Sequence, residues 1–254
     1  MKKISIHKPS KCKYSDIDFQ YYLAGIIDGD GHINTQQQIV IVFNEKEEYD
    51  AYSLMKRVGY GNIKRVKNKQ AVTWIISDKK GVIFVANLIK DKIKHPIRIK
   101  QYNTRLYPNW INEKTSENSI IDWDTPWFSG FFDTDGSFRL YILKRERNCS
   151  GFEFRLLVQI DQKGDVLLNQ IKNKFGGYIG YRKKQDTYYY SSVSFVSMSK
   201  LLLFFDKFNP QYKRYYLRYV IMRKCFLLVQ DKKHLIEKGI QKLMNYQKKL
   251  RDMI

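Results

Sequence analysis

Two aspartates in distant parts of the chain have matching surroundings. Asp30 is the last but one residue of the segment LAGIIDGDG, and Asp135 holds the same place in FSGFFDTDG. Each segment is short and apolar, contains small residues and ends in Asp-x-Asp-Gly, so the chain reads as two copies of one unit. Mg²⁺ is usually bound by one or two carboxylates together with water and substrate phosphate oxygens. One acid from each copy predicts a metal site for phosphodiester hydrolysis.

The Asp-x-Asp-Gly pattern also occurs in calcium-binding loops, so that alternative needs a test. An EF-hand loop requires a bidentate acid at its twelfth position. Counting from Asp28 leads to Ile39, and counting from Asp133 leads to Lys144. Neither residue is an acid, which excludes the calcium-loop reading.

The second and the first aspartate of each motif are expected to have different roles. Asp30 and Asp135 fall at helix C-termini, where the helix dipole makes a bare carboxylate unfavourable and a divalent cation would relieve the conflict. Asp28 and Asp133 lie two residues earlier, so their side chains point to another side of the helix. We expect these two to serve as structural hydrogen-bonding groups.

Capping residues predict where the two motif helices begin and end. Ser15, with Asp18 three residues later, is typical of a helix N-terminus. In the second copy Asp124 or Thr125 is the cap, and a first-turn proline follows. Each helix then stops at a glycine, Gly31 or Gly136, the residue type that favours a left-handed exit.

The fold class is predicted to be α+β, with two pseudo-symmetric αββαββα units. Alternating apolar and polar residues after each motif indicate antiparallel strands with one solvated face. Residues 47–58 and 165–175 read as covering helices, and hairpins are expected at 62–77 and 178–196. The polar, aperiodic stretch 112–124 is the predicted linker. The expected domains are therefore residues 1–111 and 125–254, with the motif helices packed at their interface.

Composition indicates the class of partner. The chain has 254 residues, with 46 Lys and Arg against 25 Asp and Glu and a net charge of +21. Such an excess favours a nucleic acid, because binding to phosphates releases counterions. The three cysteines show no metal or disulfide spacing. No signal peptide or spanning segment is recognisable, so we expect a soluble, intracellular protein without a membrane partner.

The polar faces and turns of the predicted sheets carry the candidate nucleic-acid contacts. Their side chains are of the types that reach phosphates and base edges. These candidates are Gln38, Asn44, Arg65, Lys67, Lys69, Arg139, Tyr141, Arg145, Arg155, Gln159, Arg182, Lys184, Tyr188, Tyr190 and Ser192.

At the two motifs the chain resembles the LAGLIDADG homing endonucleases, specifically the single-chain type with two motif copies. In that family the motif helices pack through small residues, and Ala24, Gly25 and Gly130 match. The resemblance assigns the metal-binding acids to Asp30 and Asp135. It also makes the carbonyls just before them, those of Gly29 and Thr134, candidate secondary ligands. The second copy departs from the pattern at Phe128–Ser129 and at Phe131–Phe132.

Further site residues follow from the same resemblance. PIRIKQ, residues 96–101, is similar to the family segment that carries a central lysine, which maps to Lys100. NPQYKR, residues 209–214, is its counterpart, with Lys213 the best match and Arg214 an alternative. Such a lysine would stabilise charge developing at the scissile phosphate. Gln162 matches a position that orients solvent, and its counterpart in the first copy is Glu45.

The resemblance implies a Mg²⁺-dependent endonuclease that cleaves both strands of a long asymmetric DNA site, with Mn²⁺ or Ca²⁺ as alternative occupants of the metal sites. It further implies a monomer encoded in an intron or intein, and the Lys, Asn, Ile and Tyr content suits an AT-rich mitochondrial or chloroplast genome. Two alternatives remain open. One is an RNA maturase that binds its host intron RNA, and the other is a DNA-binding protein on the same scaffold that does not cleave.

Overall fold

The structure is a computed structural model that describes residues 3–192 and 194–253. Two compact units are distinguished by their internal contacts. The first, here called the motif unit, comprises Lys13–Asp135 and Gln211–Lys213. The second, the C-terminal unit, contains residues 136–210 and the chain from 214 onward, together with the segment before Lys13. These packing units differ from the sequence halves, because both LAGLIDADG-like helices belong to the motif unit.

The motif unit contains helices and one antiparallel sheet. Its elements in chain order are α1 (Asp16–Asp30), β1 (Gly31–Ile33), β2 (Ile39–Asn44), the 3₁₀ turn η1 (Glu45–Glu47), α2 (Glu48–Val58), β3 (Asn62–Arg65), β4 (Ala71–Ile76), α3 (Lys79–Ile89), α4 (Pro96–Gln101), the π-helical turn η2 (Tyr102–Leu106) and α5 (Trp127–Asp135).

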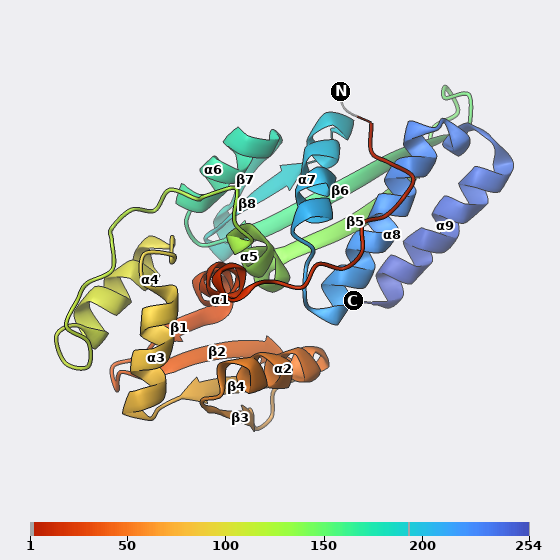
Figure 1. Ribbon diagram of the computed structural model, residues 1–254. Coiled ribbons are helices and arrows are strands. Elements are labelled where there is room, and N and C mark those ends of the chain that lie inside the picture. Colours follow the sequence, from red (N-terminus) through yellow and green to blue (C-terminus); the bar gives the residue numbers. More distant parts are fainter. Residues whose placement is uncertain (1–2, 193, 254) are drawn as a thin grey trace. The chain divides into compact units, whose positions relative to one another are not determined.

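The first sheet has the strand order β1-β2-β4-β3. Ile41 pairs with Trp74 and Phe43 pairs with Val72, and all four side chains are buried. Helices α1, α2 and α3 pack over this apolar face (Figure 1). The period-two alternation of the strands therefore determines which face becomes core and which stays open.

The C-terminal unit repeats the pattern with longer strands. Its elements are β5 (Gly136–Lys144), β6 (Phe152–Gln162), α6 (Val166–Phe175), β7 (Tyr178–Arg182), the 3₁₀ turn η3 (Lys183–Gln185), β8 (Thr187–Ser192), α7 (Phe195–Lys207), α8 (Lys213–Gln230), the 3₁₀ turn η4 (Lys233–Leu235) and α9 (Glu237–Asp252).

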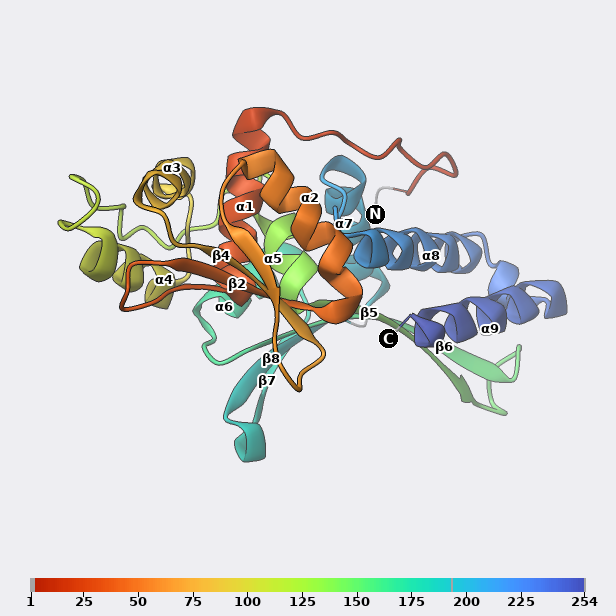
Figure 2. The ribbon, with the colours of Figure 1, turned by 90° about the horizontal axis from the view of Figure 1, so that it is seen from below.

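The second sheet has the order β5-β6-β8-β7 and is also antiparallel. Phe138 pairs with Val158 in its core, and both are fully buried. Helix α9 runs alongside α8 and packs against β5 (Figure 2). Leu243 and Leu250 of α9 are buried, and the Gln247 amide donates to the Leu140 carbonyl of β5. The predicted α+β class with αββαββα units is confirmed.

The predicted helix ends are partly correct. Ser15 caps α1 by accepting from the Asp18 N–H at 3.1 Å, as expected. Gly31 does not take the left-handed conformation that was predicted for it, because its φ is −89° and the chain continues directly into β1. Its small size is needed for another reason: a Cβ at Gly31 would lie 2.6 Å from the Ile27 Cα. A glycine in the left-handed conformation does end a different helix, α2, at Gly59.

The segment 112–124 has no helix or strand, yet it is tied to the motif unit. The Asp91 N–H donates to the Thr115 hydroxyl at 2.7 Å, and the Thr115 N–H donates to Asn103 Oδ1 at 2.8 Å. Ile121 is buried as well. This linker is therefore anchored by specific contacts. Among the described residues, no helix is both long and apolar enough to cross a membrane.

Candidate metal and nucleic-acid site

Glycines allow the two motif helices, α1 and α5, to pack backbone against backbone. A Cβ added to Gly25 would lie 2.0 Å from the Trp127 carbonyl oxygen. The relationship is reciprocal, because a Cβ added to Gly130 would lie 2.0 Å from the Tyr22 carbonyl oxygen. Only glycine fits at either position, and this close packing brings the C-terminal ends of the two helices together.

The ends of α1 and α5 meet at Gly29 and Asp135. A Cβ on Gly29 would fall 1.9 Å from Thr134 Oγ1 and 2.8 Å from Asp135 Oδ2. The Asp135 carboxylate therefore lies against the last turn of α1, the turn that carries Asp30. The structure thus brings both motif acids to one place within the motif unit.

Asp28 and Asp133 are fully buried and accept hydrogen bonds from fixed donors. Asp28 Oδ2 accepts from the Lys94 N–H at 2.6 Å and from the Trp127 indole at 2.9 Å. Asp133 Oδ2 accepts from the Tyr22 hydroxyl at 2.6 Å and from the Gln211 N–H at 2.7 Å. These contacts agree with the structural role expected for both acids.

Burial also changes how these two acids titrate. Loss of solvation raises the pKa of Asp28 to about 7 and that of Asp133 to about 8, although their hydrogen bonds act in the opposite direction. In each carboxyl group the second oxygen, Oδ1, is buried and finds no hydrogen-bond partner among the described residues. A buried oxygen without a donor favours the protonated form, so both groups hold a proton more firmly than ordinary aspartates.

The contacts of Asp28 fix the start of α4 and thereby place a basic residue that the sequence analysis missed. Arg98 Nε donates to the Ile27 carbonyl at 3.3 Å, and its Nη2 donates to the Gly29 carbonyl at 3.4 Å. The charges of Asp30 and Asp135 both act on this guanidinium. Arg98 is therefore the cation beside the motif acids. It lies two residues before Lys100, in the segment that the resemblance had singled out.

Asp30 is half-buried at this helix end. Desolvation raises the pKa of its carboxyl group to about 6, and the Arg98 charge partly offsets the rise. The buried Tyr212 phenol also senses Asp30, whose charge contributes to the raised pKa of that phenol. A further cation near Asp30 would favour the ionised form of its carboxyl group.

The donor set suits a divalent cation that shares its coordination with a substrate. No group of three or more His, Cys, Asp and Glu side chains that could hold a metal occurs among the described residues. Asp30, Asp135 and nearby carbonyls would leave several positions for water and phosphate, as Mg²⁺ prefers. The Gly29 carbonyl is already engaged by Arg98. The Thr134 hydroxyl donates to the Phe131 carbonyl at 2.7 Å and lies 3.3 Å from Asp135 Oδ2.

The roles of the two lysines predicted from the resemblance remain predictions. Lys100 is exposed and lines a cavity of about 400 Å³ together with Asn103 and Lys114. Lys213 is exposed at the first position of α8, where its N–H donates to Asp50 Oδ1 at 3.2 Å. The structure thus assigns neither lysine the contact with the motif helix that Arg98 makes.

The two predicted solvent-orienting residues end strands. Glu45 follows β2 in the motif unit, and its carboxylate lies 3.8 Å from the Arg65 guanidinium. Gln162 is the last residue of β6 in the C-terminal unit. Their roles remain predictions.

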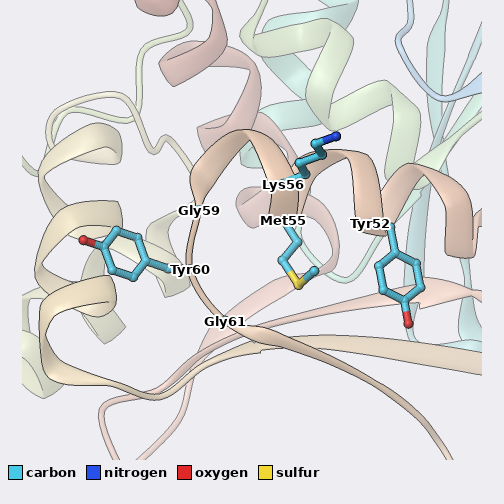
Figure 3. A pocket seen from close by; sticks show the side chains of 6 residues that line it. All are labelled: Tyr52, Met55, Lys56, Gly59, Tyr60 and Gly61. Atoms are coloured by element: carbon cyan, nitrogen blue, oxygen red, sulfur yellow. The ribbon is translucent and has the colours of Figure 1, made fainter.

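A separate cavity of about 390 Å³ lies where α2 ends, beside the loop to β3 (Figure 3). It is lined by Tyr52, Met55, Lys56, Gly59, Tyr60 and Gly61. It contains no carboxylate and therefore does not compete with the motif helices as a metal site.

On the first sheet, one predicted contact points the wrong way. Arg65 pairs in register with the buried Val72, so it lies on the face that the helices cover, and it forms an ion pair of 2.7 Å with Glu48 of α2. Strand alternation places its neighbour Lys64 on the open face instead. Asn44 is exposed, but its side chain accepts from the Lys46 N–H to cap η1. Gln38, Lys67 and Lys69 lie in the loops that flank the strands.

On the second sheet, the register places five predicted contacts on the open face: Arg139, Tyr141, Arg155, Gln159 and Arg182. Gln159, however, is only 8% exposed, which argues against the contact predicted for it. Gln159 donates to Asp161 at 2.8 Å, and Arg182 forms an ion pair with the same carboxylate. Arg145 and Lys184 lie in exposed turns.

The prediction for β8 was wrong by one residue. Tyr190 and Ser192 are both 0% exposed and lie on the covered face, and Tyr188 shares their phase. The open-face residue is Tyr189, whose ring centroid lies 4.3 Å from the Arg182 guanidinium carbon. The run from Thr187 to Ser192 shows no alternation of polarity, so its phase could not be read from the sequence.

Comparison with known proteins gives relatives that are encoded in introns. The cox1 intron-2 protein of 37.2 kDa from Schizosaccharomyces pombe, itself uncharacterised, is 39% identical over 249 residues, which are 95% of this chain and 76% of that protein. Intron-encoded RNA maturase bI4 of Saccharomyces cerevisiae is 25% identical over 202 residues, 78% of this chain and 31% of the maturase. The probable intron-encoded endonuclease aI2 of Debaryomyces hansenii is 26% identical over 212 residues, with coverages of 76% and 31%.

Solved structures share the fold. A variant of I-SmaMI superposes with a TM-score of 0.73 at 20% identity, covering 94% of this chain and 98% of that one. I-LtrWI bound to its target DNA gives 0.72 at 14% identity, with coverages of 92% and 98%. I-SmaMI bound to uncleaved DNA in the presence of calcium ions gives 0.69 at 20% identity, also with coverages of 92% and 98%.

The family assignment rests on these sequence matches and on the geometry of the motif helices. Residues 128–226 match the family described as LAGLIDADG endonuclease. The paired glycines and the adjoining acids at the ends of α1 and α5 agree with the helix packing that the resemblance implies. The chain belongs to the LAGLIDADG endonuclease family.

Proposed function

We propose that the protein is a site-specific endonuclease that cleaves both strands of a long, asymmetric DNA site. The observation that carries the proposal is the meeting of Asp135 with the last turn of α1, which places one motif acid from each copy at a common point. Because both copies lie in one chain and differ in sequence, the protein would act as a monomer on a target without twofold symmetry.

Asp30 and Asp135 would hold Mg²⁺ in this proposal, together with phosphate oxygens of the substrate. When bound there, the metal would supply charge neutralisation at the leaving oxygen and lower the pKa of an attacking water. The close α1–α5 packing supports this role, since it holds the two helix ends that carry the acids against one another. Lys100 and Lys213 remain candidates for stabilising the phosphate from exposed positions, and Gln162 and Glu45 for orienting solvent.

The open faces of the two sheets would read the DNA. Arg139, Arg155 and Arg182 project from one face of the second sheet, and Tyr189 adds an aromatic surface. Arginine is the side chain best suited to bidentate contact with guanine in the major groove. The net charge of +21 supports binding to the phosphate backbone, which supplies most of the non-specific affinity.

The relatives suggest where such a protein acts. The relative with 39% identity is named for a cox1 intron, and two others are named as intron-encoded. We infer that this chain too is encoded in an intron and works in mitochondria. Its target would then be the exon junction of the host gene before the intron is present.

Maturase activity is the second candidate function, and one relative specifically favours it. Maturase bI4 shares 25% identity across 78% of this chain. A maturase would bind its host intron RNA, and the motif acids would not be needed for that binding.

The deciding experiment incubates the protein with a linear duplex that carries the intron-less cox1 junction, with and without Mg²⁺. Cleavage at one position on each strand, dependent on the metal, is the expected result. Asp30→Asn should abolish cleavage while RNA binding persists. Asp16→Asn is the matched control on the same helix, because Asp16 is fully exposed and forms only a surface ion pair with Arg57. Tight intron RNA binding without any DNA product would favour the maturase instead.

A further inference from the structure

The guanidinium of Arg98 is built into the end of helix α1. Its Nε donates to the carbonyl of Ile27, which also accepts from the Gly31 N–H, and its Nη2 donates to the carbonyl of Gly29. Carbonyls at a helix C-terminus carry the negative end of the helix dipole and need donors. Arg98 supplies a side-chain donor to two carbonyls in the last turn of α1, so the fold sets its position.

The same guanidinium faces the motif acids. Burial lowers the pKa of Arg98, and the charges of Asp28, Asp135 and Asp30 act on the guanidinium in the opposite direction. A positive charge thus stands beside the acid pair before any metal arrives.

A bound metal and the Arg98 guanidinium would interact with the same carbonyl and carboxylate oxygens. The Gly29 carbonyl is a candidate metal ligand and already accepts from Arg98 at 3.4 Å. The Asp30 and Asp135 carboxylates are the remaining protein ligands. With Arg98 present the three side chains carry a single net negative charge, and a phosphodiester restores a second one. Attraction for a divalent cation follows that net charge.

We propose that Arg98 is a resident counter-cation of the acid pair, which keeps divalent metal weakly bound until a phosphodiester enters the site. The inference rests on the proposed function, because it requires Asp30 and Asp135 to be a metal site. It identifies Arg98 as a positioning residue that links metal occupancy to the presence of DNA, and so limits hydrolysis away from the bound target.

The test measures Mn²⁺ binding to the whole protein without DNA, by the loss of the electron paramagnetic resonance signal of free Mn²⁺. Removing the cation in Arg98→Met should tighten Mn²⁺ binding by roughly ten-fold or more. Arg98→Lys keeps the charge and should stay near the wild-type affinity. The matched control is Arg105→Met, because Arg105 donates to the Ile33 carbonyl of β1 instead of the α1 end.

A second measurement begins with the unaltered protein, and that part of it does not depend on how Arg98→Met folds. Dimethyl phosphate, a phosphodiester monoanion, should tighten Mn²⁺ binding to the wild type several-fold and should do so less for Arg98→Met. Adding Asp30→Asn to Arg98→Met should remove the gained affinity, which places the gain at the acid pair.

The outcomes separate this inference from the proposed function. Equal Mn²⁺ affinity in wild type and Arg98→Met, or the same gain in Arg105→Met, would overturn the role of Arg98. A wild type that ignores dimethyl phosphate would also overturn it. The proposed function is judged by DNA cleavage, so a cleaving enzyme with unchanged Mn²⁺ affinity in Arg98→Met would keep the function and reject the counter-cation.

Discussion

The Tyr22 hydroxyl of helix α1 donates to Asp133 Oδ2 of helix α5 at 2.6 Å, in the buried interior of the motif unit. A second hydrogen bond runs in the opposite direction: the Trp127 indole of α5 donates to Asp28 Oδ2 of α1 at 2.9 Å. Tyr22 and Trp127 each directly precede a motif, and each reaches the first aspartate of the other. The two motif copies are therefore locked to one another by matching bonds.

The first prediction concerns this lock. Tyr22→Phe removes the hydroxyl and should lower the free energy of unfolding by about 1–2 kcal/mol, because a buried hydrogen bond is lost while the ring stays in place. Urea unfolding measures the change. Tyr21→Phe is the matched control: Tyr21 is half-exposed, and its ring, over which the Lys92 ammonium lies at 5.6 Å, is retained. An equal loss in both variants would contradict the lock.

The second prediction concerns the glycine contacts. Gly25→Ala should destabilise the protein by roughly 1–3 kcal/mol or more, since overpacking forces the helices apart and the new methyl would meet the Trp127 carbonyl. DNA cleavage should fall with it, because the acids at the helix ends would separate. Gly164→Ala has open space around its Cβ and should leave both stability and cleavage near the wild-type values. Full activity in a folded Gly25→Ala variant would argue against close helix packing as the device that places the acids.

The third prediction follows from the raised pKa of Asp133, about 8 against an ordinary 3.8. The folded state keeps this proton at pH values where the unfolded chain has released it, so the group's contribution to stability falls as pH rises from about 4 to about 8. Asp133→Asn carries no titrating proton. The wild type should therefore lose stability relative to Asp133→Asn over this pH range, as measured by urea unfolding at each pH. A difference that stays constant with pH, or moves the other way, would be inconsistent with a buried protonated acid.

The fourth prediction compares two arginines that differ in the face they occupy. Arg155 and Arg65 both lie on strands and both pair with a glutamate, Glu153 and Glu48 respectively. Arg155 belongs to the open face, and its change to alanine should weaken binding to the target DNA by about 1–3 kcal/mol if it reads a base. Arg65→Ala should have a much smaller effect. Binding measured with Ca²⁺ in place of Mg²⁺ tests the pair, and a larger loss for Arg65 would reverse the assignment of faces.

Much of the fold follows from local patterns in the sequence. The cap at Ser15 and the alternation in β5 and β6 predict their elements correctly, because both signals act over a few residues. The phase of β8 did not follow, since tyrosines and serines can face either core or solvent. The position of Gly31 after a helix predicts a left-handed exit. In the structure a glycine is needed there because a side chain would collide with Ile27.

The site was predictable only in part for a similar reason. The duplicated motif singles out Asp30 and Asp135, and the structure places them at adjoining helix ends. Arg98 could not be chosen over Lys100 from the segment PIRIKQ alone. The choice depends on how α4 is set against α1, and that is fixed by the buried bond between Asp28 and the Lys94 N–H, which joins residues far apart in the chain.

The most direct test of the account is strand-specific cleavage by Asp30→Asn and Asp135→Asn, each measured on a supercoiled plasmid that carries the target site. Acids that share one place at the helix ends should both be needed for both strands, so each single variant should lose nicking and linearisation alike. Complete, undiminished nicking of one strand by either variant would mean two independent sites, and would contradict a joint metal site at the ends of α1 and α5.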